Sequence, residues 1–174
     1  MTYKECIIKS TDKLAKNPAV IFLGYNVKIR MAGGTLKNVP EDQLFETPVA
    51  ENLMSGIAIG LSLEGFIPVV YYERFDFILN ALDAIVNHLD KIEKISKGEF
   101  KPKVIFRVVV GMKNKPFYTG ITHTQDFTEA MKRMVSFPII KLTKDNIEET
   151  YQKAIDSKQS IMIIEEKELY EEQI

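Results

Sequence analysis

The residues that could carry chemistry begin with Glu51, a carboxylate just inside the expected start of a helix rich in small residues. Thr47 can cap this helix, with Pro48 at its first position. The helix dipole favours an acidic residue in the first turn of a helix. Judged from spacing alone, this structural explanation for Glu51 is more common than a catalytic one. Gly56 and Gly60 add a second signal, because a glycine inside a helix costs about 1 kcal/mol. They indicate that the helix packs closely against another backbone.

Two further side chains could take part in chemistry, the ring of Phe77 and the imidazole of His123. Phe77 follows an expected strand, and stacking on a flat ring is worth about 0.5–1.5 kcal/mol beyond burial, although an aromatic at a helix start is usually core. His123 lies in a glycine-containing loop, where a lone histidine is more often simply solvated. The other of the two histidines, His88, lies mid-helix and is expected on an exposed face.

Apolar strands that alternate with helices must position these residues. The expected strands are 20–24, 67–72, 104–110, 139–142 and 160–164; the expected helices are 48–63, 76–95, 124–134 and 146–155, with a long loop at 26–46. This pattern predicts an α/β fold, a doubly wound, mostly parallel sheet with helices on both faces. Ligands of such folds bind beyond the carboxyl ends of the strands, here at the loops after Gly24, Tyr72 and Val110.

The composition fits one globular domain over residues 1–174 and narrows the function classes. Hydrophobic residues make up 45% and charged residues 27%, and a net charge of −1 gives no reason to expect binding to nucleic acid or to an anionic membrane. Cys6 is the single cysteine, which excludes an internal disulfide and a cysteine-rich metal site. No apolar run approaches the ~18 residues of a membrane span, and the start lacks a signal-peptide core, so a cytoplasmic location is expected.

Two stretches resemble the pyrimidine-binding domain of thiamine-diphosphate enzymes: 46–51, Glu-Thr-Pro-Val-Ala-Glu, and 56–60, Gly-Ile-Ala-Ile-Gly. The beta subunits of 2-oxo acid dehydrogenases carry Asp-Thr-Pro-Ile-Ser-Glu followed by Gly-Ile-Ala-Val-Gly. In that family the glutamate activates the cofactor. The resemblance therefore implies a transketolase-like fold, a catalytic and cofactor-binding role for Glu51, and a cofactor contact for Val49.

Phe77 and His123 extend this resemblance. In the family an aromatic 26 positions after the glutamate stacks on the aminopyrimidine ring, and Phe77 occupies that position. Asn80 lies one turn further along and is expected to face the cofactor. The loop 119–125, Thr-Gly-Ile-Thr-His-Thr-Gln, resembles transketolases in Gly-x-Thr-His and the beta subunits in His-x-Gln. In both, this histidine lies near the reacting carbon, where it can donate to a substrate oxygen.

The resemblance covers about residues 18–170 and includes the tail 163–170, which is similar to the family's Leu-Glu-Asn-Glu-x-x-Tyr end. A strand that runs into a charged, solvated terminus fits this tail equally well. Gly-Asp-Gly, the family's signature for metal and diphosphate, is absent from the sequence. Thiamine diphosphate and Mg²⁺ are therefore expected to be held mainly by a separate subunit, in a heterotetramer or with a homodimer of this chain. The sequence ends where the family's C-terminal domain would begin, so that domain is not expected.

The sequence departs from the family on the substrate side. Tyr25 and Asn26 replace a Glu-Glu pair, Glu73 and Arg74 replace a Met-Thr pair, and the loop 112–115 is basic. These changes point to an unusual, anionic substrate.

Three functions stay open at this point. The favoured one is the pyrimidine-binding subunit of a split thiamine-diphosphate enzyme that acts on a 2-oxo acid or a ketose, by decarboxylation, carboligation or ketol transfer. The alternative is a non-catalytic binding or regulatory module with the same fold. A third is an unrelated flavodoxin-like domain, which would bind flavin or nucleotide as an isolated chain.

Overall fold

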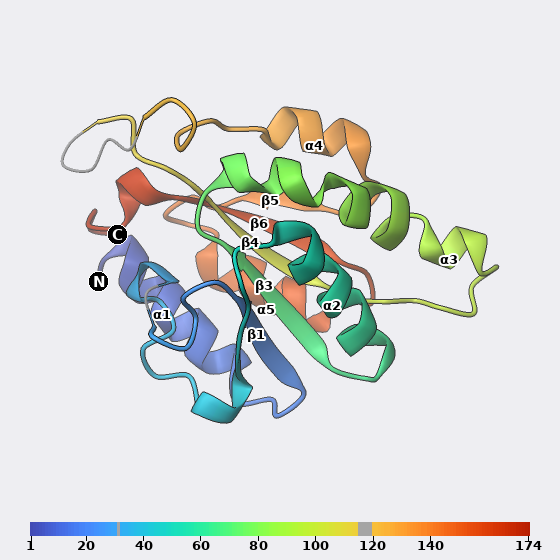
Figure 1. Cartoon of the computed structure of the whole chain (residues 1–174). Helices are drawn as coiled ribbons and strands as arrows, with labels where there is room; N and C mark the ends of the chain where they lie inside the picture. The colour runs from blue at the N-terminus through green and yellow to red at the C-terminus, as the bar shows by residue number, and fades with distance from the viewer. Residues whose placement is uncertain (31, 115–119) are drawn as a thin grey trace.

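A six-stranded sheet forms the centre of the computed structural model, which describes residues 1–30, 32–114 and 120–174 (Figure 1). Its strands in chain order are β1 (Val20–Gly24), β2 (Leu44–Glu46), β3 (Ile67–Tyr72), β4 (Ile105–Val110), β5 (Ile139–Lys141) and β6 (Ile161–Glu166). They lie side by side in the order β2-β1-β3-β4-β6-β5, and every neighbouring pair is parallel. The predicted parallel sheet is confirmed.

Helices cover both faces of the sheet. One face carries α1 (Tyr3–Leu14) and α5 (Ile147–Asp156); the other carries α2 (Glu51–Leu63), the helical segment 75–95 and α4 (Thr128–Met134) (Figure 1). Successive residues of a strand contribute to opposite apolar clusters, as Tyr71 and Tyr72 do. Burial on both faces explains why the strands are continuously apolar, and it confirms the doubly wound fold.

The helix expected over 76–95 is present but irregular. It consists of a 3-10 stretch (Phe75–Ala81), a π-helical stretch (Asp83–Leu89) and the short α3 (Ile92–Ile95). Because the first stretch follows directly after β3, Phe77 lies at the carboxyl edge of the sheet.

Other expected boundaries are wrong. The loop expected at 26–46 contains β2, whose three residues are too few to show a periodic pattern, and two single 3-10 turns. The helix expected from Pro48 begins at Glu51, and Ala50 before it is non-helical, with φ −153° and ψ 80°. Thr47 therefore does not cap the helix, and its buried hydroxyl has no hydrogen-bond partner within the described residues. Finally, α4 begins at Thr128 rather than 124.

The N-terminal helix α1 was not among the expected elements. It begins with a capping box, in which the amide of Glu5 donates to Thr2 Oγ1 at 3.2 Å and the amide of Thr2 donates to Glu5 Oε2 at 2.8 Å. Tyr3 and Ile7 on its inner face are fully buried against the sheet. Among the helices of the described chain, none has the length and apolar character needed to cross a membrane.

The glycines of α2 do not have the packing role expected of them within this chain. Gly56 and Gly60 are exposed, and a methyl group added to either would meet no other atom within 4 Å. No backbone in the described part of the chain packs closely on them, so the expected close approach is not made inside this fold.

Candidate active site

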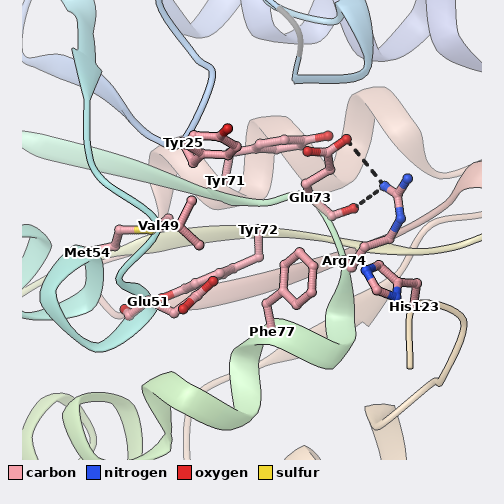
Figure 2. A pocket seen from close by; sticks show the side chains of 10 residues that line it. All are labelled: Tyr25, Val49, Glu51, Met54, Tyr71, Tyr72, Glu73, Arg74, Phe77 and His123. Carbon is pink, nitrogen blue, oxygen red and sulfur yellow. Dashed lines mark hydrogen bonds and ion pairs between the residues drawn. The ribbon is translucent and has the colours of Figure 1, made fainter. Parts of the chain in front are cut away.

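A pocket of about 300 Å³ opens at the carboxyl edge of the sheet, where the sequence predicted the ligand site (Figure 2). Its lining consists of Tyr25, Val49, Glu51, Met54, Tyr71, Tyr72, Glu73, Arg74, Phe77 and His123. These residues come from the loop after β1, the first turn of α2, the end of β3 with the turns that follow it, and the loop after β4. Glu51, Phe77 and His123 are thus brought together from three separate segments.

Glu51 is the first residue of α2 and is buried, with 8% of its surface exposed. Tyr72, at the end of β3, holds this turn in place because its hydroxyl donates to the main-chain oxygen of Glu51 at 3.0 Å. Ser55 Oγ lies 2.6 Å from the same hydroxyl. Since Tyr72 donates its only proton to Glu51, the Ser55 hydroxyl donates to Tyr72. Burial raises the pKa of Tyr72, which keeps this link neutral.

Phe77 and His123 form the wall opposite the helix. Their rings meet edge to face, with centroids 5.3 Å apart and an angle of 83° between the planes. The loop of His123 is tied to the segment of Phe77 through Asp76, whose carboxylate accepts the side-chain amide of Gln125 at 2.8 Å and its main-chain amide at 3.3 Å. Gly111 leaves space for this loop, because a side-chain carbon there would lie 2.0 Å from the main-chain oxygen of His123.

Of the two other residues predicted to bind the cofactor, Val49 lies in the pocket and Asn80 does not. Val49 lines the pocket and is 61% exposed. Asn80 is exposed and is not part of the lining, so its assignment to the cofactor stays a prediction that this geometry does not support. His88 is exposed on its helix as expected, 3.4 Å from Asp83. Lys115 and Thr119, which belonged to the predicted basic loop and histidine loop, lie outside the described residues.

Sequence reasoning missed three lining residues, Met54, Tyr71 and Tyr72, whereas Tyr25, Glu73 and Arg74 had been placed on the substrate side. A usable signal was present for two of them: Tyr71 and Tyr72 end β3, which ends at the ligand edge. Met54 was not assigned because its only signal is its place one helical turn after Glu51.

A buried ion pair supports the pocket from behind. Arg107 and Glu165 are both fully buried; Arg107 Nε lies 2.7 Å and Nη2 3.1 Å from the two oxygens of Glu165. Tyr151 and Tyr170 donate to the same carboxylate at 2.9 and 2.7 Å. Burial disfavours the charge of Arg107, but the Glu165 carboxylate outweighs it and raises the pKa of the guanidinium. The sequence also allowed residues 163–170 to be a strand that runs into a charged, solvated terminus. This interpretation is wrong for Glu165, which is fully buried.

The ion pair reaches the pocket through Tyr71, whose ring centroid lies 5.3 Å from the guanidinium carbon of Arg107. Tyr71 is 3% exposed, and burial raises the pKa of its hydroxyl. The pocket wall therefore rests on a rigid, neutral aromatic surface.

The lining suits a flat heteroaromatic ring. Phe77, Val49 and Met54 provide apolar contacts, and Glu51 is an acid whose carboxylate no side chain of the described chain engages in a hydrogen bond. A ring nitrogen is the kind of partner that such a carboxylate can share a proton with. No group of three or more potential metal-ligating side chains occurs among the described residues.

Comparison with known proteins identifies relatives of this chain, although no family model matches it. The beta subunit of the mitochondrial pyruvate dehydrogenase E1 component of Saccharomyces cerevisiae is 29% identical over 134 residues, 74% of this chain and 36% of the relative. The 3-methyl-2-oxobutanoate dehydrogenase subunit beta of Mycobacterium tuberculosis is 32% identical over 127 residues, 68% of this chain and 34% of the relative. The chain therefore spans about a third of the length of these relatives.

The fold has a counterpart among solved structures. A chain described as "split gene transketolase, inactive beta4 tetramer" superposes with a TM-score of 0.69 over 93% of this chain and 49% of that chain, at 17% sequence identity. This likeness shows the fold alone, and it agrees with the transketolase-like fold that the sequence motifs implied. The chain is thus a transketolase-like pyrimidine-binding domain, homologous to the beta subunits of 2-oxo acid dehydrogenases.

Proposed function

We propose that this chain is the pyrimidine-binding subunit of a split thiamine-diphosphate-dependent enzyme that acts on a 2-oxo acid or a ketose. The observation that carries the proposal is the convergence of Glu51, Phe77 and His123 on one pocket, each from a different segment. The relatives are subunits of dehydrogenases of pyruvate and of 3-methyl-2-oxobutanoate, both 2-oxo acids. Decarboxylation, carboligation and ketol transfer are the reactions compatible with the site.

Thiamine diphosphate, when bound, supplies the electron sink for making or breaking a bond next to a carbonyl carbon. In the proposed enzyme, Glu51 shares a proton with a ring nitrogen of the aminopyrimidine, and its place in the first turn of α2 fixes the direction of that contact. Phe77 packs on the ring, while Val49 and Met54 keep water away from it. His123 donates a proton to the substrate oxygen.

A second subunit completes this proposed site by holding the diphosphate and Mg²⁺. The described residues offer no cluster of metal ligands, and the sequence lacks Gly-Asp-Gly. The structurally similar split-gene transketolase is described as an inactive tetramer of its beta chain. By analogy, we expect this chain to be inactive alone and active in a heterotetramer with its partner.

Replacement of Glu51 with Gln tests the proposal, because the amide keeps the shape of the side chain and removes its proton exchange. In the enzyme reconstituted from both subunits, thiamine diphosphate and Mg²⁺, we expect turnover to fall by about 10²–10⁴-fold, the usual contribution of a proton-transfer group. The melting temperature should stay unchanged. Glu41→Gln, at an exposed acid in a 3-10 turn, is the matched control. Full turnover in the Glu51 variant would refute the role of Glu51.

A further inference from the structure

Three consecutive residues after β3 each contact a different residue of the segment that carries His123. The pairs are Phe75 with Phe127, Asp76 with Gln125, and Phe77 with His123. Each step forward by one position in the first segment is a step back by two positions in the second. The two segments therefore run in opposite directions and lie in a defined register.

The two outer pairs are aromatic contacts. The rings of Phe75 and Phe127 meet edge to face, with centroids 5.8 Å apart and an angle of 88° between the planes. The rings of Phe77 and His123 meet in the same way at the pocket wall (Figure 2). Such pairs are favourable over centroid distances of about 4.5–7 Å, so they tolerate sliding of one ring past the other. Aromatic contacts alone therefore do not fix the register.

The central pair supplies the directional contact. Asp76 Oδ1 accepts a hydrogen bond from the side-chain amide of Gln125 at 2.8 Å, and Oδ2 accepts one from the main-chain amide of the same residue at 3.3 Å. Both oxygens of one carboxylate thus hold one residue of the loop. Because a hydrogen bond weakens steeply away from its preferred distance and angle, this two-point contact sets the register of the two segments.

Asp76 is also a buried acid without a basic partner. It is 8% exposed, and no basic side chain of the described chain forms an ion pair with it. An acid that only served the helix dipole could remain in solvent, whereas a buried carboxylate is costly unless its oxygens accept hydrogen bonds. The two bonds from Gln125 therefore account for the burial of this charge.

The loop before Phe127 has few other restraints. Residues 120–127 contain no helix or strand. The His123 amide and the Thr124 hydroxyl donate to the main-chain oxygen of Gly120 at 3.1 and 3.3 Å, which closes a turn inside the loop without attaching it to the sheet. His123 Nδ1 lies 3.1 Å from a hydroxyl of the same loop, which leaves Nε2 as the ring nitrogen without a partner in the described residues. The direction of Nε2 thus depends on where the loop is held.

We propose that Asp76 is a positioning residue, which holds Gln125 with both carboxylate oxygens and thereby places the imidazole of His123 against Phe77. Asp76 acts through the loop and is not itself part of the pocket lining. The placement of the imidazole is a property of the isolated chain. Its consequence for turnover rests on the proposed function, in which His123 donates to the substrate oxygen.

Asp76→Asn tests the placement in the purified chain, because asparagine keeps the shape of the side chain but has only one accepting oxygen. The chain has two histidines, so the imidazole protons of His123 and His88 can be followed separately by NMR. Phe77→Leu gives the position of the His123 signals without the aromatic neighbour. In Asp76→Asn, the His123 signals should move most of the way to this reference, while the His88 signals stay in place. Unmoved His123 signals would overturn the proposal.

Asp42→Asn is the matched control, because Asp42 is an exposed acid in the 3-10 turn Glu41–Gln43. It removes the same charge and should leave the His123 signals unchanged. Gln125→Met is a second variant in case Asp76→Asn does not fold. It keeps the main-chain amide and should move the His123 signals in the same direction by a smaller amount. A lower melting temperature with unmoved His123 signals would mean a role in stability alone and would contradict positioning.

The enzyme reconstituted from both subunits, thiamine diphosphate and Mg²⁺ measures the consequence for turnover. Asp76→Asn should lower kcat about tenfold to a hundredfold, the cost of misplacing a reacting group by about 1 Å, and leave the Kd of thiamine diphosphate unchanged. The double variant with His123→Ala should be no slower than His123→Ala alone, since Asp76 acts only through His123. Losses that multiply in the double variant would refute this dependence. The NMR result stands whatever the outcome for Glu51→Gln.

Discussion

At the scale of single residues, the link between Tyr72, Ser55 and Glu51 shows how the carboxylate proposed to be catalytic is kept in place by groups that do no chemistry. Tyr72 and Ser55 are each 1% exposed, and their hydroxyls lie 2.6 Å apart. The hydroxyl of Tyr72 joins the end of β3 to the first turn of α2. Any movement of this turn would displace Glu51 from the pocket.

Replacement of Tyr72 with Phe should destabilise the chain by about 1–3 kcal/mol, because it leaves the Ser55 hydroxyl buried without a partner. The double variant with Ser55→Ala should be more stable than Tyr72→Phe alone, since removing both polar partners together is nearly neutral. Urea unfolding of the two single variants and the double variant measures this. A double variant no more stable than Tyr72→Phe would show that the hydroxyl pair is not the source of the loss.

Residue types and local spacing singled out Glu51, Phe77 and His123, because each stands at a recognisable boundary between elements. Taken alone they favoured a structural role for each, and the resemblance to pyrimidine-binding domains made them site candidates. The same signals could not reveal Arg107 and Glu165. These residues are 58 positions apart, and each was read only as part of a strand or tail. Their pairing depends on β4 and β6 being neighbours, which no local pattern in the chain specifies.

At the scale of elements, the predictable parts were those with long apolar runs. The central strands β1, β3, β4 and β6 were located within two residues of their ends, because burial on both faces requires uninterrupted apolar sequence. The three-residue β2 and the amphipathic α1 were missed, the first for its length and the second because its polar residues dominate its sequence. The starts of α2 and α4 were placed too early by a few residues, since they depend on local contacts such as that of Asp126 with the Thr128 amide at 2.9 Å.

The carboxylate of Asp90 connects two of these elements, the end of the π-helical stretch Asp83–Leu89 and the turn after α4. It accepts hydrogen bonds from the amide and the hydroxyl of Ser136, the latter at 2.7 Å, and pairs with Lys91. Burial acts to raise the pKa of Asp90, but these bonds outweigh it and hold the pKa below the ordinary 3.8. A carboxyl with a depressed pKa stabilises the fold above its ordinary pKa, and this stabilisation is lost as the pH falls through the folded-state pKa.

Asp90→Asn should therefore lower the unfolding free energy at pH 7 by about 1–3 kcal/mol, the value of hydrogen bonds to a charged group. The difference from the unmodified chain should shrink as the pH falls below 3.8, where the native carboxyl also becomes protonated. Urea unfolding at a series of pH values measures both effects. Asp145→Asn, at an exposed acid, is the control. A difference that persists unchanged in acid would mean that the charge of Asp90 is not involved.

At the scale of the whole molecule, two features differ in how complete they are. The pocket is lined by residues of this chain, whereas the glycine face of α2 is exposed and is not packed against the rest of the described chain. The pocket collects side chains from both halves of the sequence. The exposed face of α2, with Gly56 and Gly60, contacts nothing in the described chain. The sequence predicted that these glycines allow close packing, and since the fold does not use them, we expect the partner subunit or a second copy to do so.

Two sets of substitutions on this face separate folding from assembly. Gly56→Ala and Gly60→Ala should each stabilise the isolated chain by about 1 kcal/mol, because both positions are helical and an added methyl group meets no neighbour. Gly56→Leu should also leave the isolated chain folded, but it should prevent assembly with the partner, because close contact between backbones leaves no space for the larger side chain. Unfolding of the isolated chain and light scattering of the mixed subunits measure the two effects. Lys153→Leu, on the exposed face of α5, adds the same side chain elsewhere and should not affect assembly. Normal assembly of the Gly56→Leu variant would show that this face of α2 stays open to solvent in the proposed complex.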